Sequence, residues 1–229
     1  MKKFYGYYDN GNFRVGCSGA SVYVYDQNDT ELARFKDIKY AYTGAFQPNT
    51  NIFVAKSTEG SLAIYDLDKL ELKKKIIITR IGAQDEGFAF TPDGQFFYNI
   101  EKTVTSTRTS LAIYRTSDFE LEQRCYTNHE TMFLEYLEFD GCENNCYAFG
   151  YMRGDDGVFA YGFIGILSTT EVSEIKALPK DFANFVSWYK NWEISGYSEK
   201  SYNEHYLTKN GVKSTPGMLT LKDIYTKLP

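Results

Sequence analysis

The sequence of 229 residues has few of the groups from which metal and catalytic sites are most often built. It contains only two histidines, which lie far apart at His129 and His205. Its four cysteines match no zinc-binding spacing, because a Cys-x-x-x-Cys pair needs a second pair of ligands. The sequence also has no phosphate-binding loop, dinucleotide fingerprint, zinc-protease helix or serine nucleophile elbow. We therefore expect no cofactor, no metal and no enzymatic activity.

The chain also lacks an excess of positive charge and any long hydrophobic run. Lysine and arginine total 25 against 30 acidic residues, so the formal net charge is −5 and the sequence pI is about 5.2. Binders of nucleic acid or membrane surfaces usually carry a basic patch, so we expect neither kind of partner. No stretch approaches the roughly 18 apolar residues of a membrane-spanning helix.

Targeting signals and linkers are equally scarce. The N-terminal stretch Met1–Tyr5 has two lysines but no apolar segment of the kind that a signal peptide needs, which favours a cytoplasmic location. Cys142 and Cys146 flank a predicted turn and could pair in an oxidising compartment, but reduced, structural thiols are expected in the cytoplasm. Only five prolines occur, and no Pro-, Ser- or Gly-rich linker interrupts the chain. We therefore expect a single domain over residues 1–229.

What the chain does contain is a repeat. The segment Ser61-Leu62-Ala63-Ile64-Tyr65 returns unchanged 49 residues later as Ser110-Leu111-Ala112-Ile113-Tyr114. A looser copy, Ser21-Val22-Tyr23-Val24-Tyr25, lies 40 residues before the first. Self-similarity with a period of about 20–50 residues is typical of solenoids, propellers and arrays.

A turn signal keeps the same rhythm. Phe46-Gln47-Pro48-Asn49 and Phe90-Thr91-Pro92-Asp93-Gly94 each join two apolar runs, and proline followed by asparagine or Asp-Gly is turn chemistry. With weaker copies, the anchor residues define five units: Tyr8, Phe46, Phe90, Phe139 and Trp188. Each unit contains four short apolar segments separated by turn residues, which predicts a four-stranded antiparallel meander. Four-stranded units repeated in this way predict an all-β fold, a β-propeller with five four-stranded blades.

The ends of the chain are the most irregular parts of this pattern. The first unit is expected to begin with an aromatic strand, Lys3–Tyr8, and this N-terminal strand could also complete the last unit and close the ring. The fifth unit is expected to have strands at Phe185–Trp188, Trp192–Tyr197, His205–Thr208 and Met218–Leu221. A small helix at Leu219–Leu228 is the alternative for its end. A β-sandwich or a single barrel would fit the strand count but would not explain identical segments at a fixed spacing.

The chain resembles the WD40 and YVTN-type β-propeller repeats over nearly its whole length. The resemblance lies in Tyr25-Asp26 and Tyr65-Asp66, where WD repeats carry their dipeptide, and in the turn Phe90–Gln95, which is similar to Phe-Ser-Pro-Asp-Gly. The chain departs from the pattern at Tyr114-Arg115 and Ile166-Leu167, and no Gly-His pair opens any unit. The resemblance implies an architecture and does not identify a ligand.

In propellers of this type, the loops between one blade and the next gather on one face. Here these loops are residues 36–39, 79–86, 128–132 and 179–184. Their polar and charged side chains are the candidate binding residues: Arg80, Gln84, Asp85, Glu86, His129, Glu130, Lys180, Asp181 and Asn184. A solvated rim is the ordinary role of such residues, and a partner-binding face is the functional one.

Other features have ordinary structural explanations. His129-Glu130 suggests a general base, but adjacent residues of a strand point to opposite faces. Asp155-Asp156 lies between two glycines, as a tight turn requires, and a calcium site there would need more ligands. The densest basic run, residues 73–75, is expected on an outer strand, where lysine prevents edge-to-edge pairing. Trp188 and Trp192 flank a predicted turn and are expected in the core.

The sequence thus predicts a non-enzymatic protein-binding or scaffold module that binds a protein or peptide through its loop face. An inhibitor or immunity-type protein is one form of this prediction. The acidic balance favours a basic or neutral protein partner. The alternative is a glycan-binding or glycoside-hydrolysing propeller with a polar central channel, in which two carboxylates would lie roughly 5–10 Å apart.

Overall fold

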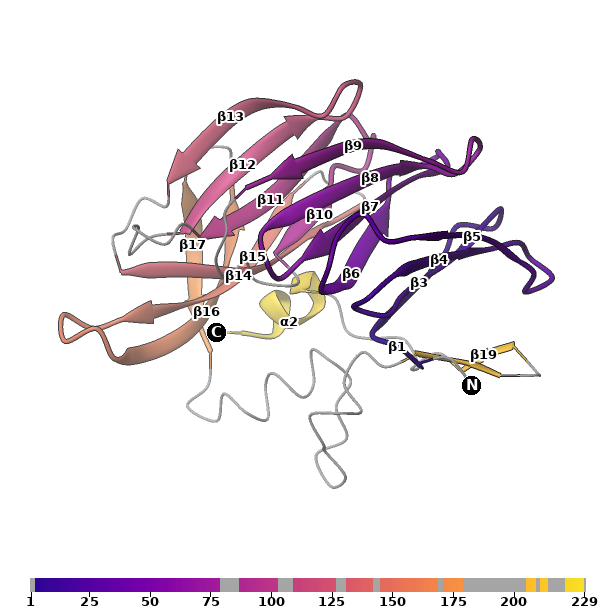
Figure 1. The fold of residues 1–229 in the computed structure, drawn as a ribbon. Coiled ribbons are helices and arrows are strands. Elements are labelled where there is room, and N and C mark those ends of the chain that lie inside the picture. Colours follow the sequence, from indigo (N-terminus) through magenta and orange to yellow (C-terminus); the bar gives the residue numbers. More distant parts are fainter. Residues whose placement is uncertain are drawn as a thin grey trace. The chain divides into compact units, whose positions relative to one another are not determined.

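The computed structural model describes residues 3–78, 87–102, 109–126, 131–141, 145–168, 171–178, 205–208, 211–213 and 221–228 (Figure 1). The chain divides into two compact units. The first comprises Met1–Asp85 with Ser198–Pro216, and the second comprises Glu86–Tyr197 with Gly217–Pro229. The sequence-based expectation of one domain over residues 1–229 stays a prediction.

The first unit contains two four-stranded antiparallel sheets whose strands pair in chain order. The strands of the first sheet are β2 (Gly6–Asp9), β3 (Arg14–Cys17), β4 (Val22–Tyr25) and β5 (Glu31–Phe35). The strands of the second sheet are β6 (Ala41–Phe46), β7 (Ile52–Ser57), β8 (Ser61–Asp66) and β9 (Glu71–Ile77). Facing apolar side chains of the two sheets, such as Val15, Val24, Phe53 and Tyr65, form one buried core.

The second unit repeats this arrangement. The strands of its first sheet are β10 (Phe88–Phe90), β11 (Phe96–Lys102), β12 (Thr109–Arg115) and β13 (Glu120–Tyr126). The strands of its second sheet are β14 (Met132–Phe139), β15 (Cys146–Arg153), β16 (Phe159–Leu167) and β17 (Val172–Ala177). Ile100, Leu111, Leu134 and Phe163 belong to the core between these two sheets. The first four predicted units are therefore confirmed as four-stranded antiparallel sheets.

The repeated pentapeptide is the third strand of its sheet. Leu62, Ala63, Ile64 and Tyr65 in β8 are fully buried, and their copies in β12 are at most 4% exposed. A strand buried on both faces has no polar positions, which is why its sequence is a continuous apolar run instead of an alternating one. The need to fill the same space in both sheets explains why the two segments are so similar.

The predicted turns adopt the backbone that their residues favour. Gly11, Asn49 and Gly94 all have positive φ at the hairpin between the first and second strands of their sheets. Asp29, Leu70 and Phe119 also have positive φ, each directly before or near the start of the fourth strand. The first group follows from turn chemistry. The second does not, because leucine and phenylalanine give no signal for a left-handed backbone.

The predicted outer strand of the second sheet is confirmed. Residues 73–75 lie in β9, the edge strand of the sheet, where exposed and half-buried side chains alternate. In the part of the chain that the structure describes, Cys17, Cys125 and Cys146 are free cysteines, and Cys142 lies outside that part. None of the described helices has the length and apolarity needed to cross a membrane.

The predicted first strand, Lys3–Tyr8, is divided into two strands of different sheets. β1 (Lys3–Phe4) pairs antiparallel with β18 (His205–Thr208), which in turn pairs with β19 (Gly211–Lys213). This pairing agrees with the expectation that the N-terminal residues join the last unit. Phe4 is fully buried over Gly16, where a Cβ atom would lie only 2.6 Å from the phenylalanine ring.

A fifth four-stranded blade is not confirmed. Of its four expected strands, residues 185–188 and 192–197 lie outside the described residues, and β18 belongs to the three-stranded sheet. The strand expected to end at Leu221 is wrong at that residue, because helix α2 (Leu221–Lys227) begins there, as the alternative predicted. Leu221, Tyr225 and Leu228 pack on Tyr147 and Ile164 of the fourth sheet. The helix thus buries apolar surface that the sheet would otherwise expose.

Candidate functional site

The nine predicted binding residues all lie outside the described residues, in segments 79–86, 127–130 and 179–204. His129-Glu130, Trp188 and Trp192 lie in the same segments. Of the four loops expected to form a binding face, the structure describes most fully the first, residues 36–39 between β5 and β6. This loop and its neighbours are therefore the part of the predicted face whose geometry can be used.

The loop between β5 and β6 is held rigidly on the first unit. Ile38 is 4% exposed and belongs to the core between the two sheets. The ammonium of Lys75 donates to the Asp37 carbonyl at 2.6 Å, and the Ser57 hydroxyl donates to the Lys39 carbonyl at 2.5 Å. The Thr58 amide donates to the carbonyl of Tyr40 at 3.2 Å. These contacts fix the loop backbone and leave the side chains of Lys36, Lys39 and Tyr40 exposed.

Three tyrosines lie beside this loop. Tyr40 is 47% exposed and has a positive φ of 53°, which is uncommon for a bulky residue and strains the backbone. Its ring lies 6.5 Å from that of Tyr42, which contacts Tyr5 edge-on with ring centroids 4.7 Å apart. Tyr5 is 37% exposed, and the ammonium of Lys3 lies 5.3 Å from its ring centroid.

The loop and the tyrosines form one exposed area of the first unit. We call it the tyrosine–lysine surface, and its members are Lys3, Tyr5, Lys36, Lys39, Tyr40, Tyr42 and Lys75. All four lysines are exposed. Among the described residues, the acids nearby are Asp37 in the loop and Glu59 in the turn between β7 and β8. Exposed tyrosine on a fixed backbone is typical of protein contact sites.

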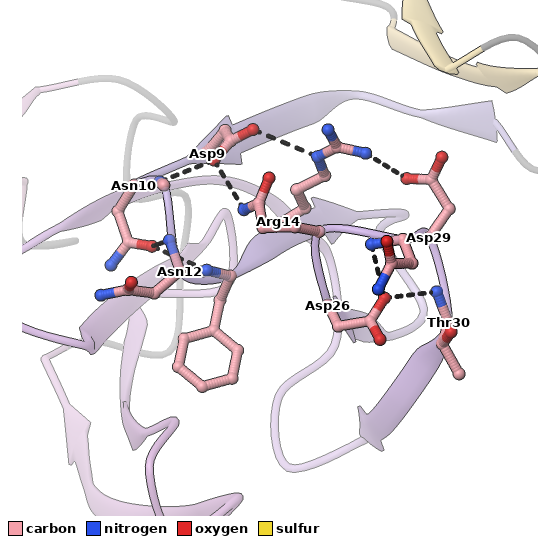
Figure 2. Close-up of polar contacts among 11 residues, drawn as sticks. Asp9, Asn10, Asn12, Arg14, Asp26, Asp29 and Thr30 are labelled. Atoms are coloured by element: carbon pink, nitrogen blue, oxygen red, sulfur yellow. Dashed lines mark hydrogen bonds and ion pairs between the residues drawn. The ribbon is translucent and has the colours of Figure 1, made fainter.

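The strands of the first sheet have the loop 36–39 at one end and the turns after β2 and β4 at the other. These turns form the opposite edge of the first unit and carry a polar network, shown in Figure 2. The Arg14 guanidinium donates to Asp9 at 3.1 Å and to Asp29 at 2.5 Å, so it joins the turn after β2 to the turn after β4. The Gly11 amide and the Gln27 side chain also donate to the Asp9 carboxylate, at 2.8 and 3.1 Å. Asp9 and Asp29 are therefore partners of one cation and hold two turns together.

The pKa values of these carboxyls agree with a structural role. Burial alone would raise the pKa of Asp9, but hydrogen bonds from Gly11, Gln27 and Arg14 outweigh it, and the pKa lies below its ordinary value. The backbone amides of Thr30 and Asn28 lower the pKa of Asp26, to which each donates at 2.8 Å. Carboxyls with lowered pKa values stay ionised at neutral pH, so Asp9 and Asp26 are unsuited to act as general acids.

A second set of contacts joins this edge of the first sheet to the second sheet. The Asn10 side-chain amide donates to the Thr50 carbonyl and to the side-chain oxygen of Asn51, both at 3.0 Å. Asn12 also donates to Asn51, and Asn51 donates to Asp68 at 2.7 Å. We call the edge formed by these turns the turn edge of the first unit. Its polar side chains are occupied with one another.

The second unit has a buried polar network of its own. The Glu101 side chain has no exposed surface, and its carboxylate lies 2.6 Å from the guanidinium of Arg124. The hydroxyl of Tyr114 and the side-chain amide of Asn99 donate to the same carboxylate at 2.7 and 3.2 Å. In the second sheet, the position equivalent to Glu101 is Ser57, because each lies opposite the serine that opens the repeated strand. The negative charge of Glu101 is compensated by the positive charge of Arg124, which indicates a structural role for this pair.

Glu138 is a described carboxyl whose pKa is raised. Burial in β14 raises it, while the backbone amide of Leu221, which donates at 2.8 Å, lowers it. Glu138 therefore binds the first residue of helix α2, and Lys222 adds an ion pair with Asp140 at 2.6 Å. Among the described residues, no three histidine, cysteine or acidic side chains come together in a way that could hold a metal ion.

Asp155 and Asp156 form the tight turn that their flanking glycines predict. Gly157 has a φ of 77°, and its amide donates to the Gly154 carbonyl at 2.9 Å. The Asp156 side chain accepts a hydrogen bond from the Val158 amide, also at 2.9 Å. Asp156 therefore stabilises the turn between β15 and β16.

Sequence reasoning included the loop 36–39 but selected no residue in it, and it missed the tyrosines. The signal that could have found them is local: Tyr40 and Tyr42 follow two lysines in a chain whose net charge is negative. The contact between Tyr42 and Tyr5 joins residues far apart in sequence and could not be read from spacing. The Arg14 and Glu101 networks were missed for the same reason, since each depends on neighbouring strands.

No protein-family model matches the sequence, and no curated protein matches it either. Among solved structures, the chain is similar to hydrazine synthase of Kuenenia stuttgartiensis, with a TM-score of 0.61 and 16% identity over 75% of this chain and 52% of that one. It is also similar to the WD40 domain of Toxoplasma gondii coronin, with a TM-score of 0.55 and 12% identity over 77% of this chain and 45% of that one. This chain thus spans about half the length of each. The likeness supports the WD40-like architecture expected from the repeats.

Proposed function

We propose that this chain is a non-enzymatic protein-binding module that engages its partner through the tyrosine–lysine surface. The observation that carries the proposal is the rigid loop 36–39. Hydrogen bonds from Ser57 and Lys75 fix its backbone, while the side chains of Lys36, Lys39 and Tyr40 are exposed to solvent. A surface that is already ordered loses little conformational entropy when it binds. Tyrosine supplies a large contact area with few rotatable bonds.

The strain at Tyr40 supports the same proposal. A bulky residue with positive φ costs of order 1–3 kcal/mol, and such residues persist where the surrounding contacts enforce them. Here the enforcing contacts are the paired amides and carbonyls of Gly19 and Ala41, at 2.9 and 3.1 Å, together with the bond from Thr58. Glycine or asparagine would adopt this backbone more easily. The tyrosine side chain is therefore kept at some expense in stability, which is typical of a contact residue.

The carboxylates of the described networks do not favour catalysis. Asp9 and Asp29 share Arg14, Glu101 pairs with Arg124, and Glu138 binds the backbone of α2. Each of them has a structural partner that would have to be displaced before the carboxylate could reach a substrate. An inhibitor or immunity-type protein, which acts by covering a partner, is one form of the function that we propose.

The test is capture followed by reconstitution. The tagged chain is used to capture proteins from the source cell, and a stoichiometric partner is purified and mixed again with the chain in measured amounts. We expect a complex that the variant Tyr40→Asn weakens, with Tyr161→Asn, an exposed tyrosine of β16 in the second unit, as the matched control. Recovery of no protein partner, with binding to an immobilised glycan set instead, would contradict the proposal.

A further inference from the structure

We infer that the tyrosine–lysine surface takes an acidic polypeptide segment, with aromatic or aliphatic side chains between its carboxylates. This inference rests on the proposed function and names the chemistry of the partner. Its basis is the separation of charge within the first unit, which the net charge of −5 conceals.

The two edges of the first unit have opposite charge. The turns after β2, β4 and β8, together with the strand residues that flank them, carry seven acids against two bases, and these residues are Asp9, Asp26, Asp29, Glu31, Asp66, Asp68 and Glu71 with Arg14 and Lys69. The tyrosine–lysine surface carries four lysines, with two acids nearby. Within the described residues, a negatively charged chain is therefore positive at a place where tyrosines are exposed on a rigid loop. Complementary charge at that place is negative.

The charges at the two edges also differ in what they contact. Asp9, Asp29 and Asp68 accept hydrogen bonds from side chains of the same unit. Lys36 and Lys39 form no ion pair with any described carboxylate. An exposed lysine without a partner costs the fold nothing and contributes little to it. It remains available to a carboxylate of another molecule.

Polypeptide is favoured over nucleic acid by the tyrosines themselves. Bases bind by stacking on an open aromatic face. The Tyr5 ring is already engaged by Lys3 and by the edge contact with Tyr42. Tyr5 and Tyr40, which are 37% and 47% exposed, can contact the side chains and carboxylates of a polypeptide.

The experiment starts with a displayed library of random peptides selected on the immobilised wild-type chain. We expect the recovered peptides to be enriched in glutamate and aspartate and to contain aromatic or aliphatic residues. A recovered peptide then serves as the labelled probe in anisotropy titrations. Its affinity should fall about tenfold with Lys39→Glu, further with Lys36→Glu and Lys39→Glu together, and steeply with added salt.

The matched control is Lys69→Glu, which makes the same change of charge at the turn edge. Lys69 is 66% exposed and pairs with Asp66 at 3.2 Å. We expect this variant to bind the probe with unchanged affinity. Equal losses for Lys39→Glu and Lys69→Glu, recovery of neutral or basic peptides, or recovery of no peptide would each overturn the inference.

Two further experiments are needed. One distinguishes an acidic peptide from other polyanions, and the other distinguishes failure of this inference from failure of the proposed function. Single-stranded RNA and phosphatidylserine vesicles are titrated against the same variants, and binding of either one tighter than that of the acidic peptide overturns the inference. A reconstituted partner that binds Lys39→Glu as well as wild type would overturn the inference and leave the proposed function intact. The proposed function fails when no protein partner is found, or when Tyr40→Asn binds the partner as well as wild type does.

Discussion

The two edges of the first unit use charge in different ways. At the turn edge, Asp9, Arg14 and Asp29 are bound to one another, and Asn51 and Asp68 continue the network toward the second sheet. At the opposite edge, backbone carbonyls of the loop 36–39 receive the hydrogen bonds, and the side chains of Lys36 and Lys39 do not take part. The difference separates residues that hold the fold from residues that are available to a partner.

The comparison predicts which substitutions change stability and which change binding. Substituting a buried or half-buried charge that is paired within its unit should lower the free energy of unfolding and leave binding unchanged. Substituting a charge of the tyrosine–lysine surface should do the opposite. Additivity is expected between the two groups, because they share no partner.

The largest effect is expected for Glu101→Ala. This variant tests, in the second unit, whether loss of an internally paired charge lowers the free energy of unfolding. The substitution removes the acceptor of Arg124, Tyr114 and Asn99 from a fully buried position and should lower the free energy of unfolding by about 3 kcal/mol. Urea denaturation measures this change in the free energy of unfolding. Glu122→Ala is the control, because Glu122 is half exposed and pairs with Arg115 at the surface. Similar losses for the two variants would contradict the structural role of Glu101.

Arg14→Met is expected to have the next largest effect. The methionine keeps much of the arginine side chain but leaves Asp9 and Asp29 without their cation, so the free energy of unfolding should fall by about 2 kcal/mol. The affinity for a peptide probe should stay within twofold of wild type. A stable Arg14→Met variant with weakened binding would reverse the assignment of the two edges.

Tyr40→Asn is expected to change stability and binding in opposite directions. Asparagine tolerates positive φ, so the variant should unfold at the same or slightly higher urea concentration, a gain of up to about 1 kcal/mol. The same variant should bind the partner more weakly, since it lacks the exposed ring. A large loss of stability would show that Tyr40 is needed for folding and not for contact.

Acid should weaken the turn edge through Asp26. The pKa of Asp26 is lowered in the folded chain by the amides of Thr30 and Asn28, below the ordinary value of 3.8. Its contribution to stability is therefore present above about pH 4 and is lost as the pH falls through the folded value. Asp26→Asn keeps the acceptor and removes the titration, so its urea midpoint should fall less on acidification than that of wild type. Parallel midpoint curves for the two proteins would contradict this assignment.

The smallest effect is expected for the exposed lysines. Lys39→Glu and Lys69→Glu should each change the free energy of unfolding by less than about 0.5 kcal/mol, as surface substitutions usually do. Thermal and urea unfolding of both variants beside wild type measure this. A clear destabilisation by Lys39→Glu would mean that its loss of binding reports on folding.

Much of the fold could be predicted from sequence because the repeat is a packing requirement. The Ser-Leu-Ala-Ile-Tyr strand fills a buried position in two sheets, and Gly11, Asn49 and Gly94 mark turns by their own conformational preference. The left-handed backbone at Leu70 carries no such mark. The start of helix α2 at Leu221 could not be decided either, because a short apolar segment fits a strand as well as a helix.

The candidate site could be predicted only as a loop. The expected face included residues 36–39, but the contact of Tyr5 with Tyr42 and the bond from Ser57 to the Lys39 carbonyl depend on neighbouring strands. The net charge and its distribution lead to different predictions for the partner, because the net charge averages an acidic edge and a basic one. The charge of −5 favoured a basic or neutral partner, whereas the distribution of charge favours an acidic segment.

Hydrogen–deuterium exchange of the chain with and without its reconstituted partner shows which edge of the first unit the partner covers. We predict that the partner slows exchange in residues 3–6 and 36–42, which contain most of the tyrosine–lysine surface. We predict no change in residues 9–12 and 26–30, where the turn edge holds itself together. Protection confined to those turns, with none at residues 36–42, would contradict the account.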